Sequence, residues 1–191
     1  MAEAKAPEKE LQKATTPREK APVVAAEDFA ETVLSVRRVA KVIEGGRRLT
    51  FAVLVVVGDR QGNVGIASGK STEVSSAISK AVRLARKNMV SVELYKTTIP
   101  FDIEGKHGAS KVLLRSASKG TGLIAGGAVR AVIDALGVKD ILAKSLGSSN
   151  PSNVARATLN ALEQLRSAKE IAHLRGKKLS EIIGDKNVAA Q

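Results

Sequence analysis

Residues 49–57 read Leu49-Thr50-Phe51-Ala52-Val53-Leu54-Val55-Val56-Val57, an almost unbroken apolar run. A run of this length that ends in β-branched residues predicts a strand at the centre of a sheet. Upstream, residues 32–43 alternate loosely and end in a β-branched pair, which also favours a strand. The turn Glu44-Gly45-Gly46-Arg47 joins the two, because glycine accepts a positive φ without penalty. Downstream, the polar turn 59–63 leads to a third strand over residues 64–67.

A helix is expected after these three strands, and Ser71 or Thr72 can cap its first turn. Apolar residues then recur at helical spacing: Val74, Ala77, Ile78, Ala81 and Ala85. The opposite side of the same helix carries Lys80, Arg83, Arg86 and Lys87. The order β-β-β-α over residues 29–93 predicts a two-layer α+β domain.

A second α+β domain is expected over residues 98–175. Two β-rich runs, 98–104 and 111–116, are separated by an expected turn at Gly105-Lys106-His107-Gly108. A glycine-rich loop over residues 120–127 leads into a helix at 128–136, which Gly137 can end. A strand at 141–144 precedes a further helix, for which Asn150 is a good N-cap and Pro151 a good first residue. The order is β-β-α-β-α, with no internal repeat between the two domains.

The composition limits the partner. The 191 residues hold 31 Lys plus Arg against 19 Asp plus Glu, a formal net charge of +12, which indicates a polyanion as partner. The chain has no Cys, no Trp, one Tyr and three Phe. The missing cysteines exclude disulfides and thiol chemistry, and the scarce aromatics exclude binding that relies on stacked bases. Since no apolar run reaches the ~18 residues of a membrane span, we expect a soluble protein.

The positive charge is concentrated in the two domains. The first 31 residues hold five bases and seven acids and show no apolar periodicity, so residues 1–28 are expected to form a disordered tail. This segment lacks the continuous apolar stretch of a secretory signal, and its acids argue against a transit peptide, which leaves the cytoplasm as the expected location. Residues 176–191 are expected to form a second, shorter tail.

The strongest electrostatic feature is the first hairpin. Five bases, Arg37, Arg38, Lys41, Arg47 and Arg48, flank the Gly45-Gly46 turn, and only Glu44 opposes them. Such a tip presents several cations to phosphates, and its glycines allow the backbone to approach closely. The alternative is a solvated turn whose charges give solubility alone. The density of bases favours nucleic-acid binding.

The glycine-rich loop Gly120-Thr121-Gly122 to Gly126 has the spacing of a dinucleotide-binding turn, and helix N-termini do bind phosphates. However, it follows antiparallel-looking strands and lacks the parallel β-α-β context of that motif. We therefore favour contact with RNA phosphate or with a protein over a cofactor site. The start of the last helix, at Asn150 and Pro151, is best explained as a capped helix start.

No catalytic or metal-binding constellation is visible. His107 and His173 are the only histidines, and neither has carboxylates at ligand spacing. No nucleophile, base and acid occur together in a recognisable set. We expect no enzymatic activity, no cofactor and no metal.

Several strings, collinear over residues 29–176, resemble the ribosomal protein S5 family of the small subunit. They are Arg38-Val39-Ala40-Lys41-Val42 with Gly45-Gly46-Arg47-Arg48, then Phe51 to Asp59, Lys87-Asn88-Met89, Gly120 to Val132, Leu142 to Pro151, and Asn153 to Thr158. Many long matches in one order are far more specific than an isolated glycine motif.

The resemblance implies a fold and a function. The first domain would be similar to a double-stranded-RNA-binding domain that lacks its first helix, and the second would contain a left-handed β-α-β crossover. Such a protein binds small-subunit rRNA and stabilises the head relative to the body. With ribosomal protein S4 it contributes to translational accuracy, and ribosomal protein S8 is a further neighbour.

The resemblance, together with the charge and turn positions, also suggests site residues. The expected rRNA contacts are Arg37, Arg38, Lys41, Gly45, Gly46, Arg47, Arg48, Lys70, Lys106 and Lys111. Val39, Ala40 and Lys41 match the loop near the spectinomycin site. Lys119, Gly120, Gly122 and Arg130 match the surface that faces S4, although Lys119 reverses the charge usual in the family. Two alternatives stay open at this point: a free nucleic-acid binder of nucleoid type and a dinucleotide enzyme.

Overall fold

The computed structural model describes residues 29–183, so the expected tail at 1–28 and the residues after 183 lie outside the described part. The first domain consists, in order, of β1 (Ala30–Ile43), β2 (Gly46–Gly58), β3 (Asn63–Ser71), α1 (Val74–Lys87) and β4 (Met89–Ser91). The strands form one antiparallel sheet in the order β1-β2-β3-β4. The short strand β4 is an addition to the predicted β-β-β-α order.

Helix α1 packs closely on β2 and β3 because both surfaces are made of small residues. Val53, Val55 and Val57 of β2 form one core with three alanines of α1: Ala77, Ala81 and Ala85. Glycines of β3 lie under the same helix, and a Cβ on Gly65 or Gly69 would collide with its backbone. The helix therefore sits nearer the sheet than larger side chains would allow.

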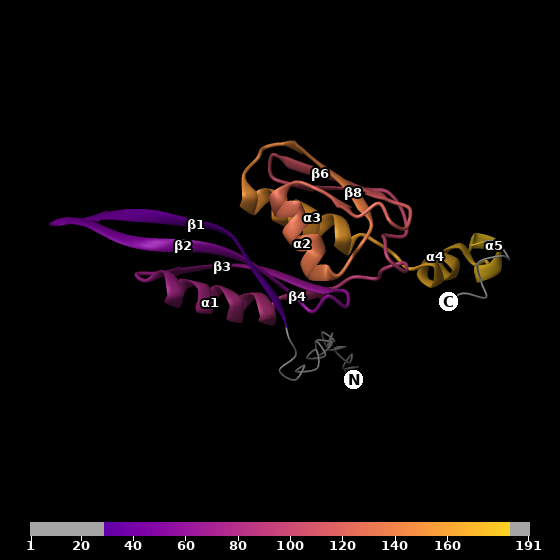
Figure 1. Cartoon of the computed structure of the whole chain (residues 1–191), viewed down its shortest axis with the longest axis horizontal. Helices are drawn as coiled ribbons and strands as arrows, with labels where there is room; N and C mark the ends of the chain where they lie inside the picture. Colours follow the sequence, from indigo (N-terminus) through magenta and orange to yellow (C-terminus); the bar gives the residue numbers. More distant parts are fainter. Residues whose placement is uncertain (1–28, 184–191) are drawn as a thin grey trace, which may run out of the picture.

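Strands β1 and β2 are longer than the helix that covers them. Fourteen helical residues span about 21 Å, whereas thirteen or fourteen strand residues span about 45 Å. The pairing between β2 and β3 ends at Phe51 and Ser71, so residues Val39–Thr50 form a two-stranded extension, which we call the arm. Figure 1 shows the arm at the left, projecting beyond α1.

The second domain contains two layers. Its elements are β5 (Ile103–His107), β6 (Ser110–Ser116), β7 (Leu123–Ile124), α2 (Gly127–Leu136), β8 (Ile141–Gly147) and α3 (Pro151–Glu163). The sheet order is β5-β6-β8-β7, with β7 parallel to β8 and the other pairs antiparallel. Helices α2 and α3 pack together and cover one face of this sheet, as Figure 1 shows.

Two further helices, α4 (Ala168–Arg175) and α5 (Leu179–Ile183), follow α3. Figure 1 shows them to the right of the second sheet. Helix α4 begins at a capping Ser167, whose Oγ accepts the N–H of Glu170 at 3.2 Å, and ends at Gly176. Helix α5 lies in the stretch expected to form the C-terminal tail.

One apolar core extends across both domains. It contains Val56 and Val64 of the first domain together with Val132, Ile133 and Leu136 of α2. Backbone hydrogen bonds accompany this packing. The N–H groups of Arg60 and Gly62, in the turn between β2 and β3, donate to the carbonyls of Ala135 and Leu136 at 3.0 and 3.1 Å. This turn therefore supplies donors to the unsatisfied C-terminal carbonyls of α2.

Several local predictions need correction. The N-cap of α1 is Glu73, not Ser71 or Thr72, because β3 continues to Ser71. Gly105, Lys106 and His107 lie inside β5 and do not form a turn, since the chain reverses at Gly108 and Ala109. Gly137, Asn150 and Pro151 end and start their helices as predicted.

Candidate nucleic-acid interface

The register of β1, β2 and β3 sorts the basic side chains of the first domain onto two faces. Arg37 is paired with Ala52, and Ala52 with Lys70, so these residues form one row across the sheet. Ala52 alternates with the valines that face α1, so the row lies on the face opposite α1. Lys41 and Arg48 form a second pair on that same face, further along the arm.

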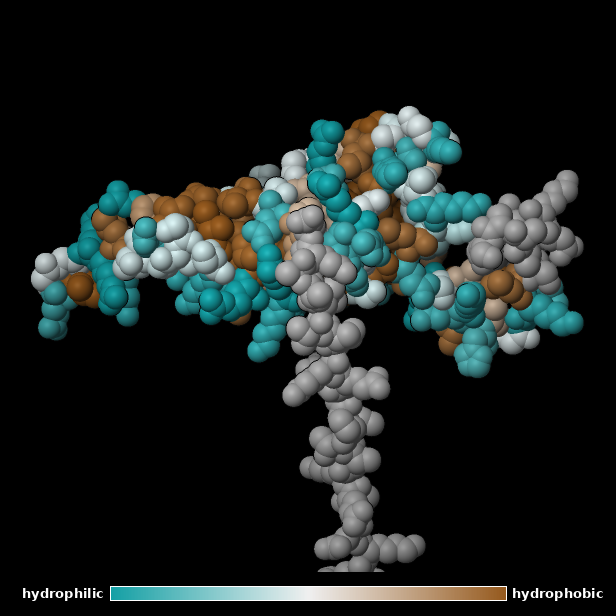
Figure 2. Space-filling model, turned by 60° about the horizontal axis from the view of Figure 1, so that its bottom comes forward, coloured by the Kyte–Doolittle hydropathy of each residue, from teal (hydrophilic) through white to brown (hydrophobic). Residues whose placement is uncertain are grey.

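Two further bases, Arg38 just before the arm and Arg47 within it, lie on the face that continues from α1. Arg38 is paired with Phe51, and Arg47 with Val42. Exposed apolar side chains share this face, among them Val36 (48% exposed) and Val42 (75% exposed). In Figure 2, hydrophilic side chains gather at the distal end of the arm, and a hydrophobic stretch lies next to them towards the rest of the molecule.

The pair Lys41 and Arg48 is unfavourable in the isolated protein. Two like charges directly opposite each other on neighbouring strands destabilise a sheet. Among residues 29–183, no arm base has an ion-pair partner, since the three salt bridges join Arg86 with Glu31, Lys111 with Glu104, and Arg115 with Asp102. A two-stranded arm is also marginally stable alone. An arm of this kind gains stability when a polyanion neutralises its charges.

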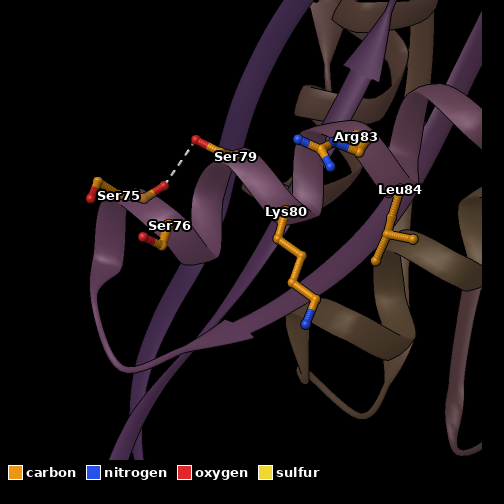
Figure 3. A pocket seen from close by; sticks show the side chains of 6 residues that line it. All are labelled: Ser75, Ser76, Ser79, Lys80, Arg83 and Leu84. Atoms are coloured by element: carbon orange, nitrogen blue, oxygen red, sulfur yellow. Dashed lines mark hydrogen bonds between the residues drawn. The ribbon is translucent and has the colours of Figure 1, made fainter.

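The outer side of α1 adds further positive charge. Figure 3 shows a shallow surface depression along this helix, with Lys80 and Arg83 projecting from it beside Ser75, Ser76 and Ser79. Arg86 is engaged within the protein, because it pairs with Glu31 at 2.8 Å and lies 4.9 Å from the centre of the Phe29 ring. The sequence predicts these bases on one helix side, but not the engagement of Arg86.

Lys106 and Lys111 do not join the arm. They are directly paired on β5 and β6 in the second domain, with Lys111 lying 3.6 Å from Glu104. His107, at the end of β5, is half-buried. The sequence-predicted RNA contacts therefore fall into two groups: one on the first sheet, and one on the second.

The glycine-rich loop is held by a residue that sequence reasoning missed. The backbone N–H groups of Gly120 and Gly122 donate to the same carboxylate oxygen of Asp140, at 2.9 and 3.0 Å. Asp140 is buried, and these bonds, the one from Gly122 foremost, keep the pKa of its carboxyl below the ordinary value against the effect of burial. A side-chain bond from Thr97 lowers this pKa further.

This arrangement argues against a phosphate site in the loop. The two amides that would bind a pyrophosphate already donate to a negatively charged carboxylate, which repels a second anion. Lys119 and Arg130 are exposed beside the loop. The sequence holds one signal for this role of Asp140: it is an acidic residue directly before the strand β8.

Other classes of site find no support among residues 29–183. In this part of the chain, no group of three or more His, Asp or Glu side chains is arranged to hold a metal ion. None of the helices described is long and apolar enough to cross a membrane.

Comparison with protein families gives two matches. Residues 29–93 match the model of the ribosomal protein S5 N-terminal domain, and residues 105–175 match that of the ribosomal protein S5 C-terminal domain. Together the matches cover most of the chain, in the order in which the two domains occur in the structure. The chain therefore belongs to the ribosomal protein S5 family: it is a structural, RNA-binding constituent of the small ribosomal subunit and not an enzyme.

Proposed function

We propose that this protein stabilises the head of the small subunit relative to its body in the cytoplasmic ribosome, with the arm as its main rRNA contact. The observation that carries this proposal is a set of bases, on the arm and on the sheet next to it, that have no ion-pair partners among the described residues. Arg37, Lys70, Lys41 and Arg48 lie on one face, and Arg38 and Arg47 on the other. A projecting arm with cations on both faces suits insertion between RNA segments.

Gly45 and Gly46 support close approach of the RNA backbone at the tip. Both have positive φ values, 87° and 148°, and an added Cβ at either would meet nothing within 4 Å. The tip is therefore thin and open to a ligand. Val39, Ala40 and Lys41, just before it on β1, form the segment that we propose lies near the spectinomycin site.

The second domain supplies a proposed protein contact. We propose that Lys119, Gly120, Gly122 and Arg130 face ribosomal protein S4 and that this contact influences decoding accuracy. The two hydrogen bonds that Asp140 accepts from Gly120 and Gly122 support this proposal because they give the loop a fixed shape. Ribosomal protein S8 is proposed as a further neighbour.

Charge reversal on the arm tests the RNA-binding part of the proposal. In the double variant Lys41→Glu, Arg48→Glu, two phosphate contacts are lost, and binding to small-subunit rRNA weakens. The slope of log affinity against log salt should become shallower by about 0.7 to 0.9 for each lost contact. The measurement is a salt titration of rRNA binding with the full chain.

The control for this experiment is Lys169→Glu, a reversal at an exposed lysine of α4. It changes the net charge without touching the arm, so its salt slope should match the unchanged protein. If the arm variant shows the same slope as the control, the arm is not the main RNA contact.

A further inference from the structure

The α1 side of the first sheet is only partly covered. Helix α1 packs on β2 and β3 and barely touches β1. Three aliphatic side chains are therefore open to solvent beside the helix: Val33 (44% exposed) and Val36 (48%) of β1, and Leu49 (41%) of β2. Val33 and Val36 are paired with Val55 and Val53, which belong to the core beneath α1, so they share its face. We call Val33, Val36 and Leu49 the uncovered stripe, and Figure 2, which brings the α1 side forward, shows a hydrophobic stretch in this part of the molecule.

The outer edge of β1 is open as well. Among residues 29–183, β1 pairs with β2 alone, although it is fourteen residues long. A long edge strand presents unpaired N–H and C=O groups that invite pairing with another chain, and proteins usually cover or block such an edge. The uncovered stripe and the free edge lie on the same strand, so one extended peptide segment beside β1 satisfies both.

RNA is a poor occupant for the uncovered stripe. Arg38 shares this face, but Arg86 is engaged by Glu31 at 2.8 Å and by the ring of Phe29, whose centre lies 4.9 Å away. The stripe holds no aromatic ring on which a base could stack. An aliphatic surface with one free base beside it therefore favours an apolar peptide.

The chain enters the described structure at the end of this stripe. Phe29 directly precedes β1 and packs against the core beneath α1. Twenty-eight residues precede it in the sequence. Residues 21–26, Ala-Pro-Val-Val-Ala-Ala, are the longest uncharged stretch among them. An aliphatic segment of this chain is thus attached close to the surface that lacks a cover.

The spacing along the chain suits a segment that folds back. Val23 and Val24 lie six and five residues before Phe29. Val33 and Val36 lie four and seven residues after it. A chain that reverses direction just before Phe29 therefore brings the two pairs of valines level, since each extended residue advances about 3.3 Å.

Charge also favours this occupant. Residues 22–28 contain two acids, Glu27 and Asp28, and no base. The phenylalanine that follows them lies against Arg86, and Arg83 is a neighbour of Arg86 on the helix surface. Arg83 is exposed and has no ion-pair partner within residues 29–183. The two acids are therefore attached beside free positive charge, and Asp is a residue that favours chain reversal.

We propose that residues 22–28 of this chain fold back along β1 and cover the uncovered stripe, with Val23 and Val24 against it. The segment completes the apolar layer beside α1 and blocks the free edge of β1. This inference goes beyond the proposed function, because it concerns the chain itself and leaves the arm bases Lys41 and Arg48 open to RNA. It narrows the expected disordered tail to residues 1–21.

A photo-crosslinking residue in place of Val36 tests the inference in the isolated full chain. Cleavage after glutamate releases residues 20–27 and residues 32–44 as separate peptides. The expected product is a crosslink between these two peptides in material that keeps the mass of one chain. The double variant Val23→Asp, Val24→Asp should lower the yield roughly tenfold, because it removes two apolar contacts from the stripe.

The matched control is Thr15→Asp, Thr16→Asp, which adds the same two charges outside the segment and should leave the yield unchanged. Equal yields in the two variants would contradict the inference, because the crosslink would then reflect nearness in sequence alone. Two unlinked peptides would contradict it as well, and so would a crosslink at the mass of two chains, which identifies a second copy as the occupant. In assembled small subunits the same probe should again link residues 20–27, and an adduct with rRNA or with another protein would overturn the assignment.

Discussion

At the scale of single residues, Asp140 fixes the glycine-rich loop on the surface of the second domain. Its carboxylate accepts the N–H groups of Gly120 and Gly122, which connects the loop to the start of β8. The loop could be predicted from its glycines alone, but its inward-pointing amides could not. Their acceptor lies 18 to 20 residues further along the chain, and only the fold brings it into place.

We predict that Asp140→Ala loosens the loop and reduces decoding accuracy. The variant leaves two partly buried N–H groups without an acceptor, so the amide protons of Gly120 and Gly122 should exchange faster with solvent. Hydrogen exchange measures the first effect, and a misreading reporter in cells measures the second. Faster exchange with unchanged accuracy would contradict the proposed S4-facing role while leaving the structural role intact.

The same carboxylate makes the loop sensitive to acid. Because the pKa of Asp140 is lowered in the folded protein, its contribution to stability is complete above the unfolded pKa of about 3.9. It is lost as the pH falls from there through the lowered folded pKa. In the unchanged protein, the protection factors of the Gly120 and Gly122 amides, which correct for the intrinsic pH dependence of exchange, should therefore fall only below about pH 4.

At the scale of elements, the sequence predicts strands and helices well where local pattern determines them. The apolar run 49–57 is the centre of β2, and the alanine side of α1 is buried as expected. The prediction of a turn was wrong at Gly105. The sequence predicts a turn there, yet Gly105 lies in β5, where glycine is needed because a Cβ would collide with the Ala157 carbonyl of α3. Close approach between elements cannot be distinguished from a turn by local sequence.

The start of α1 offers a prediction at this scale. Its N-cap residue, Glu73, has extended backbone angles, φ −116° and ψ 144°, but makes no side-chain capping bond. The shorter Glu73→Asp side chain should reach the free N–H groups and stabilise the protein by about 0.5 to 1 kcal/mol. Denaturant unfolding measures this change. The variant Glu73→Gln, which removes the charge without shortening the side chain, should give no gain.

At the scale of the whole molecule, the two family domains behave as one packed body. They share an apolar core, and the turn between β2 and β3 donates two backbone hydrogen bonds to the end of α2. Gly58, at the end of β2, allows this contact, since a Cβ there would meet the Ala135 carbonyl. The order of the expected strands and helices divides the sequence into two domains. However, no local pattern in the sequence predicts the contact between the β2–β3 turn and α2. The arm and the glycine-rich loop are thereby held in a fixed relation, as the proposed role of stabilising the head relative to the body requires.

We therefore predict that Gly58→Ala weakens the whole protein and not one domain alone. The new methyl group forces β2 and α2 apart, at a cost of about 3 kcal/mol in the free energy of unfolding. Calorimetry of the unchanged chain should show one cooperative transition, and the variant should lower its midpoint or divide it into two. Gly127→Ala, where a Cβ meets nothing within 4 Å, is the matched control and should leave the single transition in place. Two separate transitions in the unchanged protein would show that the domains unfold independently, and the arm would then owe its position to the RNA alone.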